Sequence, residues 1–177
     1  MIQKIVQSGN TKLRVVSKPV LKFDKKIINL IQDLKDTLSV QKDPEGVGLA
    51  APQIGINLRV FVTNYEDFER VVVNPEIIEK TLKIEKSKTQ KKGNEILEGC
   101  LSLPNYYGPL KRDGFVRLKY LDEKAKEVIE EFKGFNAQII LHEVDHLNGI
   151  LFIDRLLEQN KKLYKLDIND EWEEVEI

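Results

Sequence analysis

This chain has one cysteine, two histidines and a formal net charge close to zero, and these low values exclude several classes of protein. A single cysteine among 177 residues excludes an intramolecular disulfide and suits a reducing compartment. The formal net charge of -1 gives no reason to expect DNA or a membrane as the main partner. Met1 to Ser8 contains no apolar core of a signal peptide, and no apolar run approaches the length of a membrane span. We therefore expect one compact domain, residues 1–177, that is monomeric and cytoplasmic.

Both histidines of the chain fall within five residues, in the sequence His142-Glu143-Val144-Asp145-His146. Residues four apart lie on one face of an α-helix, so the two imidazoles can bind one metal ion while Glu143 places a carboxylate beside it. The surrounding stretch is predicted to be helical, with Asn136 capping its start and Gly149 ending it. Its apolar stripe consists of Ile140, Leu141, Val144 and Leu147, while Ile139 lies on the side of the histidines.

Two histidines at helical spacing can also be ordinary surface or core residues, and the spacing alone gives about even odds. Catalytic zinc-type sites commonly use three protein ligands plus water, so a third ligand must come from a thiolate or carboxylate elsewhere. Cys100, in the segment Glu98-Gly99-Cys100-Leu101-Ser102, is the best candidate. The competing interpretation is that this lone cysteine is a small residue of the core.

An uncharged, glycine-rich segment spans Gly46 to Gly55, and Gln53 carries its single polar side chain. Glycines allow a backbone to approach a ligand closely, which favours the wall of a pocket. A tight loop packed on the core explains the composition equally well. The segment lacks the Gly-Lys-Ser/Thr ending of a phosphate-binding loop, so nucleotide binding is disfavoured.

The rest of the chain predicts mixed helices and strands. We expect an extended segment up to Leu21, an amphipathic helix capped by Asp24, and a final short helix between Asp154 and Tyr164. Neighbouring strands are expected at 58–63 and 71–74, and a hairpin at 116–132 with its turn at 122–126. The lysine-rich segment 80–94 is interpreted as a solvated loop, with contact to ribosomal RNA as the alternative. The acidic end of the chain is expected to be solvated or frayed, unless Trp172, Val175 and Ile177 hold it against the protein.

Three segments in a fixed order, Gly46 to Gly55, Glu98 to Ser102 and His142 to Gly149, together resemble the peptide deformylase family. The resemblance implies an α+β fold in which a central metal-binding helix is surrounded by small, mostly antiparallel sheets. It also implies removal of the N-terminal formyl group from new formylmethionyl polypeptides, which would be the substrates.

By position, the resemblance makes Cys100, His142 and His146 the metal ligands and Glu143 the general acid and base. The Gln53 side-chain amide and the Leu101 backbone N–H would stabilise the oxygen that becomes negative. The residues expected to bind substrate are Gly46, Val47, Gly48, Tyr107, Phe135 and Ile139. Gly48 would meet the substrate backbone, and Val47, Tyr107, Phe135 and Ile139 would border the methionine pocket.

The residues alone do not decide the identity of the metal. A thiolate with two imidazoles suits zinc, but the general order of affinities does not choose among iron, cobalt, nickel and zinc. The resemblance implies Fe²⁺ as the physiological ion, with Zn²⁺, Ni²⁺ or Co²⁺ able to replace it. Two departures from the family pattern stand out. Family members often carry arginine where Tyr107 aligns, and the segment 80–94 is longer than in many relatives.

Two other functions are compatible with parts of the sequence. A zinc peptidase also uses His-Glu-x-x-His, but such enzymes generally take a carboxylate or histidine as third ligand. A non-catalytic metal-binding module associated with the ribosome would make the lysine-rich segment its functional part. Glu143 and Gln53 favour the hydrolase over that module. Asp145 is expected either to pair with Arg112 or Arg155 beneath the metal site or to be a solvated charge of the helix.

Overall fold

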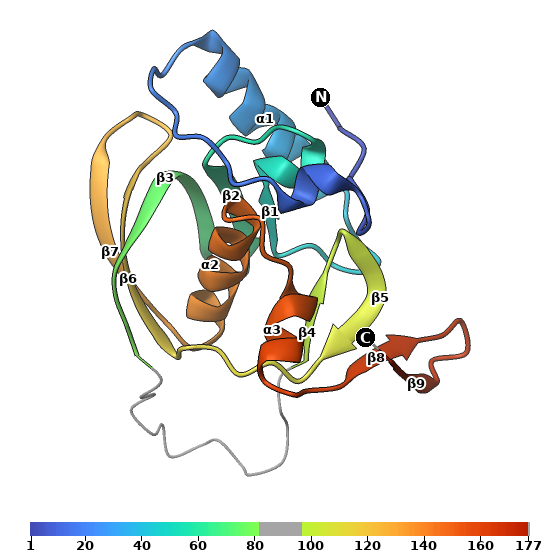
Figure 1. Cartoon of the computed structure of the whole chain (residues 1–177). Coiled ribbons are helices and arrows are strands. Elements are labelled where there is room, and N and C mark those ends of the chain that lie inside the picture. Colours follow the sequence, from blue (N-terminus) through green and yellow to red (C-terminus); the bar gives the residue numbers. More distant parts are fainter. Residues whose placement is uncertain (82–96, 177) are drawn as a thin grey trace.

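The computed structural model describes residues 1–81 and 97–176, which form two antiparallel sheets with one helix between them (Figure 1). The first sheet has the strand order β1-β2-β3-β6-β7 and the second has the order β4-β5-β8-β9. The strands are β1 Gly48–Ala50, β2 Val60–Tyr65, β3 Phe68–Thr81, β4 Glu98–Cys100, β5 Leu103–Gly108, β6 Phe115–Leu121, β7 Glu127–Lys133, β8 Leu163–Leu166 and β9 Trp172–Val175. The α-helices are α1 Lys25–Ser39, α2 Gly134–Leu147 and α3 Phe152–Glu158. The expected α+β fold around a central helix is confirmed.

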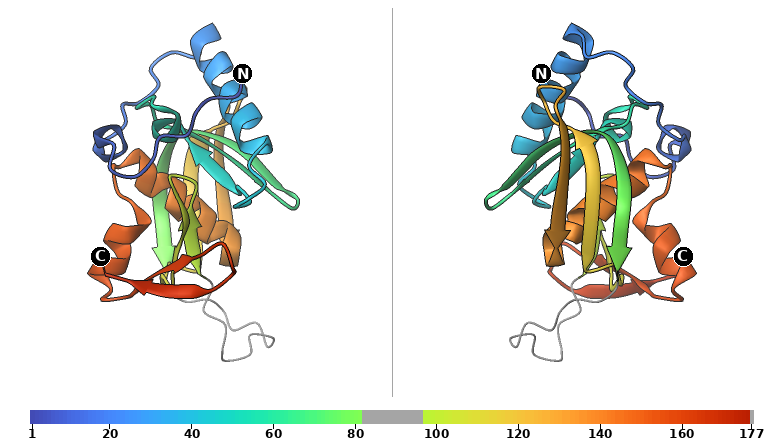
Figure 2. Two further views of the ribbon diagram at one scale, coloured as in Figure 1. Left: turned by 90° about the vertical axis from the view of Figure 1, so that its right-hand side faces the viewer. Right: turned by 90° about the vertical axis from the view of Figure 1, so that its left-hand side faces the viewer.

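At β1 and β2, the five-stranded sheet is covered by a different helix on each face. Successive side chains of a strand point to opposite faces, so Val60 and Val62 pack toward α1 while Phe61, between them, packs toward α2. This double cover explains why β2 begins with four consecutive buried residues instead of an alternating pattern. Figure 2 shows the strands β3, β6 and β7 lying over one side of α2. Helix α1 lies at the end of the molecule opposite the hairpin β8–β9.

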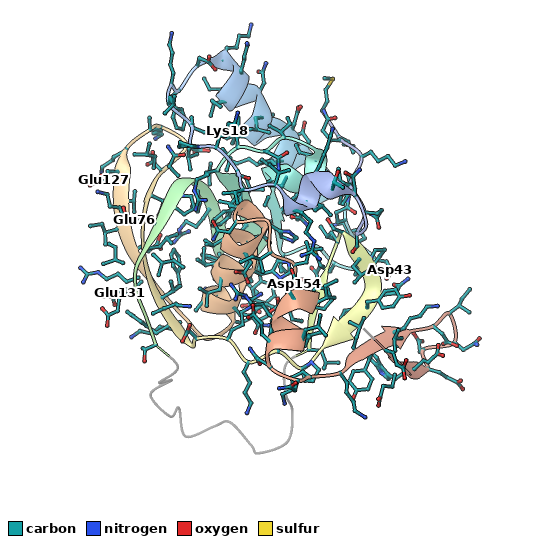
Figure 3. The ribbon with its side chains drawn as sticks, in the orientation of Figure 1. Lys18, Asp43, Glu76, Glu127, Glu131 and Asp154 are labelled. Atoms are coloured by element: carbon teal, nitrogen blue, oxygen red, sulfur yellow. The ribbon has the colours of Figure 1, made fainter. Side chains whose placement is uncertain are left out.

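Helix α1 begins where Asp24 accepts hydrogen bonds from the backbone N–H groups of Lys26 and Ile27. The side of α1 that faces the sheet is buried, through residues spaced three or four apart, and the other side is exposed. The buried residues are Ile27, Leu30, Ile31, Leu34, Thr37 and Leu38. The outer side of the five-stranded sheet carries charges that point into solvent, among them Glu76, Glu127 and Glu131 (Figure 3).

Four local predictions need correction. The N-terminal segment includes a 3₁₀ helix, Thr11–Arg14, so it is not extended throughout. Helix α3 covers Phe152–Glu158, and its continuation from Leu163 is a strand. The acidic C-terminal end forms the hairpin β8–β9 and is not frayed: Trp172 packs edge-on against Tyr107 with ring centroids 5.5 Å apart, and Val175 packs on the cluster around Leu163. Asn136 is not an N-cap, because α2 begins at Gly134 directly after β7.

The hairpin predicted at 116–132 forms β6 and β7, which pair from Phe115–Lys133 to Leu121–Glu127. The expected strands at 58–63 and 71–74 correspond to β2 and β3, which are antiparallel neighbours. Most of the lysine-rich segment, residues 82–96, lies outside the described residues. No described helix has the length and apolarity that crossing a bilayer would require.

Gly149 ends the central helix in the left-handed conformation, with φ +73°, and a side chain there would meet the carbonyl oxygen of Arg14. We expect Gly149→Ala to lower the free energy of unfolding by more than the roughly 1–2 kcal/mol that the left-handed conformation alone costs a residue with Cβ. Urea denaturation of the metal-free protein, followed by circular dichroism, measures the change.

Gly134 provides the matched control for this substitution. It also has a positive φ, +58°, but a Cβ there would have no heavy atom within 4 Å. Gly134→Ala should therefore show the conformational cost without the collision. Equal losses of stability in the two variants would show that the contact with Arg14 does not matter.

Candidate metal centre

Helix α2 carries both histidines and is buried on nearly all sides. It lies between the five-stranded sheet and β4, and its mostly apolar sequence allows residues around the helix to pack. The chain enters α2 straight from β7, where Gly134 adopts a positive φ and Lys133 occupies the cap position without a side-chain hydrogen bond. The polar residues Glu143, Asp145 and His146 are buried within this setting, so their side chains need partners inside the protein.

Cys100 approaches the two histidines from the end of β4. Its Sγ lies 3.2 Å from His146 Nε2, and His146 Nε2 lies 3.2 Å from His142 Nε2. The three ligand atoms all lie within 4.8 Å of one another. Bond lengths of about 2.0–2.3 Å in a tetrahedral site place ligand atoms roughly 3.3–3.6 Å apart. The spacing and the chemistry of the three donors therefore fit one divalent metal ion.

The His142 ring is held by a chain of charged side chains behind it. Its Nδ1 lies 2.6 Å from Glu98 Oε1, which leaves Nε2 to face Cys100 and His146. Both oxygens of Glu98 accept hydrogen bonds from Arg112, at 2.6 and 2.7 Å, and a third Arg112 nitrogen donates to Asp145 at 2.7 Å. Such partners of a metal ligand fix the ring orientation and raise its affinity for the metal.

The Asp145 carboxylate accepts further hydrogen bonds from Arg155, at 2.7 and 3.1 Å. Asp145 is thus paired with both arginines that the sequence suggested as alternatives. Burial raises the pKa of Glu98, but the hydrogen bonds from Arg112 and the neighbouring His142 outweigh it and lower that pKa to about 2. Glu98 therefore stays ionised and accepts a hydrogen bond from the Nδ1–H group of His142.

Gln53 reaches the same place from a 3₁₀ helix, Ala51–Ile54, that follows β1. Its Oε1 accepts a hydrogen bond from the Ala50 N–H at 2.8 Å, which requires the side-chain amide to direct Nε2 the other way. Nε2 lies 3.2 Å from Ser102 Oγ and 3.5 Å from Cys100 Sγ. The only polar side chain of the glycine-rich segment is thus a fixed N–H donor beside the thiol.

Glu143 is buried next to the metal-binding atoms, and its Oε2 has no hydrogen-bond partner within the described parts of the chain. Burial raises the pKa of Glu143 to about 7, although the charge of a protonated His142 would act in the opposite direction. A carboxyl group with a free oxygen and a pKa near neutrality can both accept and return a proton.

Gly48 is what allows this carboxylate to lie where it does. A Cβ at Gly48 would come within 2.5 Å of Glu143 Oε1 and 2.9 Å of its carboxyl carbon. We expect Gly48→Ala to displace the carboxylate and to lower kcat by on the order of 100-fold, because small misplacements of a catalytic group are costly. Steady-state turnover at saturating substrate concentration measures this loss.

A double-mutant cycle with Glu143→Asp tests the physical reason for that loss. The shorter side chain withdraws the carboxylate by one methylene and leaves room for the new methyl group. Gly48→Ala should then cost less in the Glu143→Asp background than in the wild type. If the two losses simply multiply, the contact between residues 48 and 143 is not the cause.

A pocket of about 190 Å³ opens in front of these residues, between two sheet edges. β1 is the edge strand of the five-stranded sheet and β4 is the edge strand of the four-stranded sheet. Both contribute residues to the pocket wall, on either side of His142 and Glu143. The pocket is therefore a cleft with α2 as its floor. Its two sides are strand edges that have no further strand partner among residues 1–81 and 97–176.

The structure brings the predicted site residues together. The pocket is lined by Gly46, Val47, Gly48, Gln53, Cys100, Leu101, Tyr107, Phe135, Ile139, His142 and Glu143. His146 lies directly behind them and is almost fully buried. Sequence reasoning missed the hydrogen bond from Gln53 to Ser102 and the lining residues Glu45, Asn105, Tyr106 and Gln138. The only signal in the sequence was that each of these residues lies close to one of the three motifs.

Known proteins with the same sequence features share one description. The family model for polypeptide deformylase matches residues 2–162. Peptide deformylase 1 of Clostridium acetobutylicum is 40% identical over 157 residues, which cover 89% of this chain and 96% of that protein.

Solved structures give the same result. The crystal structure of peptide deformylase from Thermotoga maritima is 37% identical, with a TM-score of 0.76 over 88% of this chain and 97% of that one. A class I type b peptide deformylase from Acinetobacter baumannii, determined with Met-Ala-Ser bound, is 32% identical, with a TM-score of 0.77 over 88% of this chain and 98% of that one. With its sequence and its fold both matched over nearly nine-tenths of its length, this chain belongs to the peptide deformylase family.

Proposed function

We propose that Glu143, Gln53 and the Leu101 N–H perform the reaction of this chain, a metal-dependent hydrolase that removes the formyl group from the N-terminus of new polypeptides. The observation that supports these roles best is the meeting of three separate segments in one pocket. Cys100, His142 and His146 present three ligand atoms there, with Glu143 and Gln53 beside them. A purely structural cluster would not leave a buried carboxylate oxygen without a partner.

Cys100, His142 and His146 are the residues that would hold the metal. When bound by three protein ligands, a divalent ion supplies Lewis acidity and lowers the pKa of water toward neutrality. Glu98 keeps the His142 ring in the orientation that this binding needs, because its carboxylate lies 2.6 Å from Nδ1.

Glu143 is the proposed proton carrier. Its unpartnered Oε2 would accept a proton from the attacking water and return it to the nitrogen of the departing amine, which is otherwise a poor leaving group. Gly48 and the buried surroundings keep this carboxylate in one place. A positioned acid and base of this kind typically accelerates a reaction by about 10²- to 10⁴-fold.

Gln53 and Leu101 are proposed to stabilise the negative charge that develops on the formyl oxygen. The Gln53 amide is already oriented by Ala50 and Ser102, so it needs little rearrangement as the charge forms. Leu101 lines the same pocket immediately after Cys100, where its backbone N–H would be the second donor. Each such donor is typically worth about 10²- to 10³-fold in rate.

The cleft between β1 and β4 is proposed to receive the peptide in an extended form. Its apolar lining residues Val47, Phe135 and Ile139, with Tyr107 at the wall, suit the methionine side chain. Gly46 and Gly48 keep the opposite wall free of side chains, and the edge strands offer backbone groups for pairing. The complex of the Acinetobacter baumannii protein with Met-Ala-Ser supports the choice of a short methionyl peptide as ligand.

A formate-release assay tests this function against the alternatives. Formyl-Met-Ala-Ser should yield formate and Met-Ala-Ser, while acetyl-Met-Ala-Ser and internal peptide bonds should remain intact. Cleavage of internal bonds without formate release would identify a peptidase. Binding of metal without any turnover would favour the non-catalytic module.

For the physiological ion we propose Fe²⁺, with Zn²⁺, Ni²⁺ and Co²⁺ as replacements that the same donors accept. Cys100 is only partly buried, so an iron enzyme should lose activity through oxidation of its thiolate ligand and its metal. Activity followed in air and under argon after anaerobic purification distinguishes the ions. Equal decay in both gases, with zinc found by elemental analysis, would count against iron.

Four broader expectations belong to this proposal. We expect residues 1–177 to act as one catalytic domain and the protein to be a cytoplasmic monomer. We also expect any ribosome contact to be transient and to involve the lysine-rich segment, most of which lies outside the described residues. Sedimentation analysis with and without ribosomes tests the monomer and the contact together.

A further inference from the structure

The hairpin β8–β9 lies beside β5, a strand that lines the pocket, and follows the end of the family match at residue 162 (Figure 1). It extends the sheet that begins with β4: Tyr107 of β5 pairs with Tyr164 of β8, and Leu166 of β8 pairs with Trp172 of β9. Directly opposed and alternate residues of a sheet share one face, so these four side chains lie on the same face. The opposite face is occupied, because Leu163 and Val175 pack on α3 and its surroundings.

This face is continuous with the pocket through Tyr107. Tyr107 lines the pocket on one side and meets Trp172 on the other, with ring centroids 5.5 Å apart and an angle of 75° between the rings. Trp172 itself is 51% exposed. An aromatic surface therefore leads out of the pocket and remains open to solvent.

The surroundings of this surface are acidic. Residues 161–176 contain six carboxylates and three lysines. One of these lysines, Lys162, is paired with Glu174 at 2.7 Å, and the carboxylates remain in excess. Glu45 lines the pocket, and Asp43 lies close enough to Tyr107 for its charge, together with burial, to raise the pKa of the tyrosine (Figure 3). Among the described residues that line the pocket, none is lysine or arginine.

We propose that the face formed by Tyr107, Tyr164, Leu166 and Trp172 is a subsite for the part of the substrate that follows formylmethionine, and that it favours basic side chains. The inference rests on the proposed function, because the peptide must leave the pocket past Tyr107. Aromatic rings attract cations, and nearby carboxylates strengthen that preference. The same negative charge would repel RNA, so a peptide is the occupant that the surface fits.

The distances indicate which side chains reach this subsite. An extended peptide advances about 3.3 Å per residue, so the 5.5 Å between the Tyr107 and Trp172 rings corresponds to roughly two residues. The third and fourth residues of the substrate are therefore the ones expected to meet Trp172. The preference adds to the family's reaction without altering it, since the chemistry occurs at the other end of the cleft.

Two formylated tetrapeptides test the proposal: formyl-Met-Ala-Lys-Lys-amide and formyl-Met-Ala-Glu-Glu-amide. At low salt we expect kcat/KM of the wild type to favour the lysine peptide by about tenfold, and salt to weaken this preference. Trp172→Ala should reduce the ratio by roughly threefold, mainly through KM, while Trp172→Phe should preserve most of it. A substitution that only disturbed the fold would slow both peptides and leave the ratio unchanged.

Ile168→Ala is the matched control, because Ile168 is a large apolar residue of the same hairpin that is 97% exposed. Its ratio should equal that of the wild type. A wild-type ratio below about two, or equal ratios for the wild type and Trp172→Ala, would overturn the subsite. So would a dimer in gel filtration that Trp172→Ala dissociates, since the face would then join two copies.

Formyl-Met-Ala separates this proposal from the function on which it rests. This dipeptide is too short to reach Trp172. If the wild type releases formate from it but does not distinguish the tetrapeptides, only the subsite is wrong. If no formylated peptide is hydrolysed by the metal-loaded enzyme, the proposed function itself is wrong.

Discussion

We expect Glu143→Ala to lower kcat for formyl-Met-Ala-Ser by about 10²- to 10⁴-fold while the protein still binds one metal ion per chain. The expected size follows from the contribution of a positioned general acid and base. Metal binding persists because the ligand atoms belong to Cys100, His142 and His146, and none of them is hydrogen-bonded to Glu143 within the described structure. Formate release and elemental analysis on the same preparation measure both quantities.

Glu143→Gln is the sharper variant, because it keeps the shape of the side chain and removes its ability to carry a proton. It should be as inactive as the alanine variant, and its free energy of unfolding should not fall. The wild-type carboxylate oxygen is buried without a partner, so a neutral side chain in its place costs less to bury. An active Glu143→Gln enzyme would remove Glu143 from the mechanism.

Cys100→Ala is expected to abolish activity by a different route, through loss of the metal. Losing even the outer partners of a metal ligand costs about 10- to 100-fold in affinity, and losing the ligand itself should cost more. The variant should therefore contain little metal after gel filtration and regain little activity when metal is added. Titration with Zn²⁺ or Co²⁺, monitored by a competing chelator, gives the affinity.

Cys100→Asp controls for the change in shape at this position. A carboxylate is a possible metal ligand, so this variant should retain more metal than Cys100→Ala. The stability of the two metal-free variants should be similar, because Cys100 is only partly buried. A Cys100→Ala protein with one tightly bound ion and wild-type turnover would exclude the thiolate from the site.

Sequence reasoning located the helix, the hairpin and the three residues that the structure brings together as a possible metal site, because their signals are local or chemically restricted. The spacing of Ile27, Leu30, Ile31 and Leu34 follows the 3.6-residue period of a helix packed on one side, and these residues are buried in α1. With two histidines and one cysteine in the chain, few residues were available to bind a metal with nitrogen and sulfur atoms. That these three residues lie close together follows from the fold, and the sequence indicated it only indirectly.

The features that escaped prediction depend on contacts between distant residues. Asn136 has the chemistry of an N-cap, but α2 starts two residues earlier because Gly134 turns the chain directly out of β7. The acidic C-terminal segment has few apolar residues, and its pairing as β8–β9 depends on packing against Tyr107. The closeness of Gly48 to Glu143 is likewise a matter of backbone approach, which no local pattern in the sequence reports.

The strands that flank the pocket, β1 and β4, are each three residues long. A peptide lying between them would be recognised mainly through its main chain, which is the same in every protein. Few main-chain hydrogen bonds can form along strands this short, so the affinity for the peptide is limited and the product can dissociate rapidly. The shortness of these two strands therefore favours a broad range of substrates and a short-lived complex with each nascent chain.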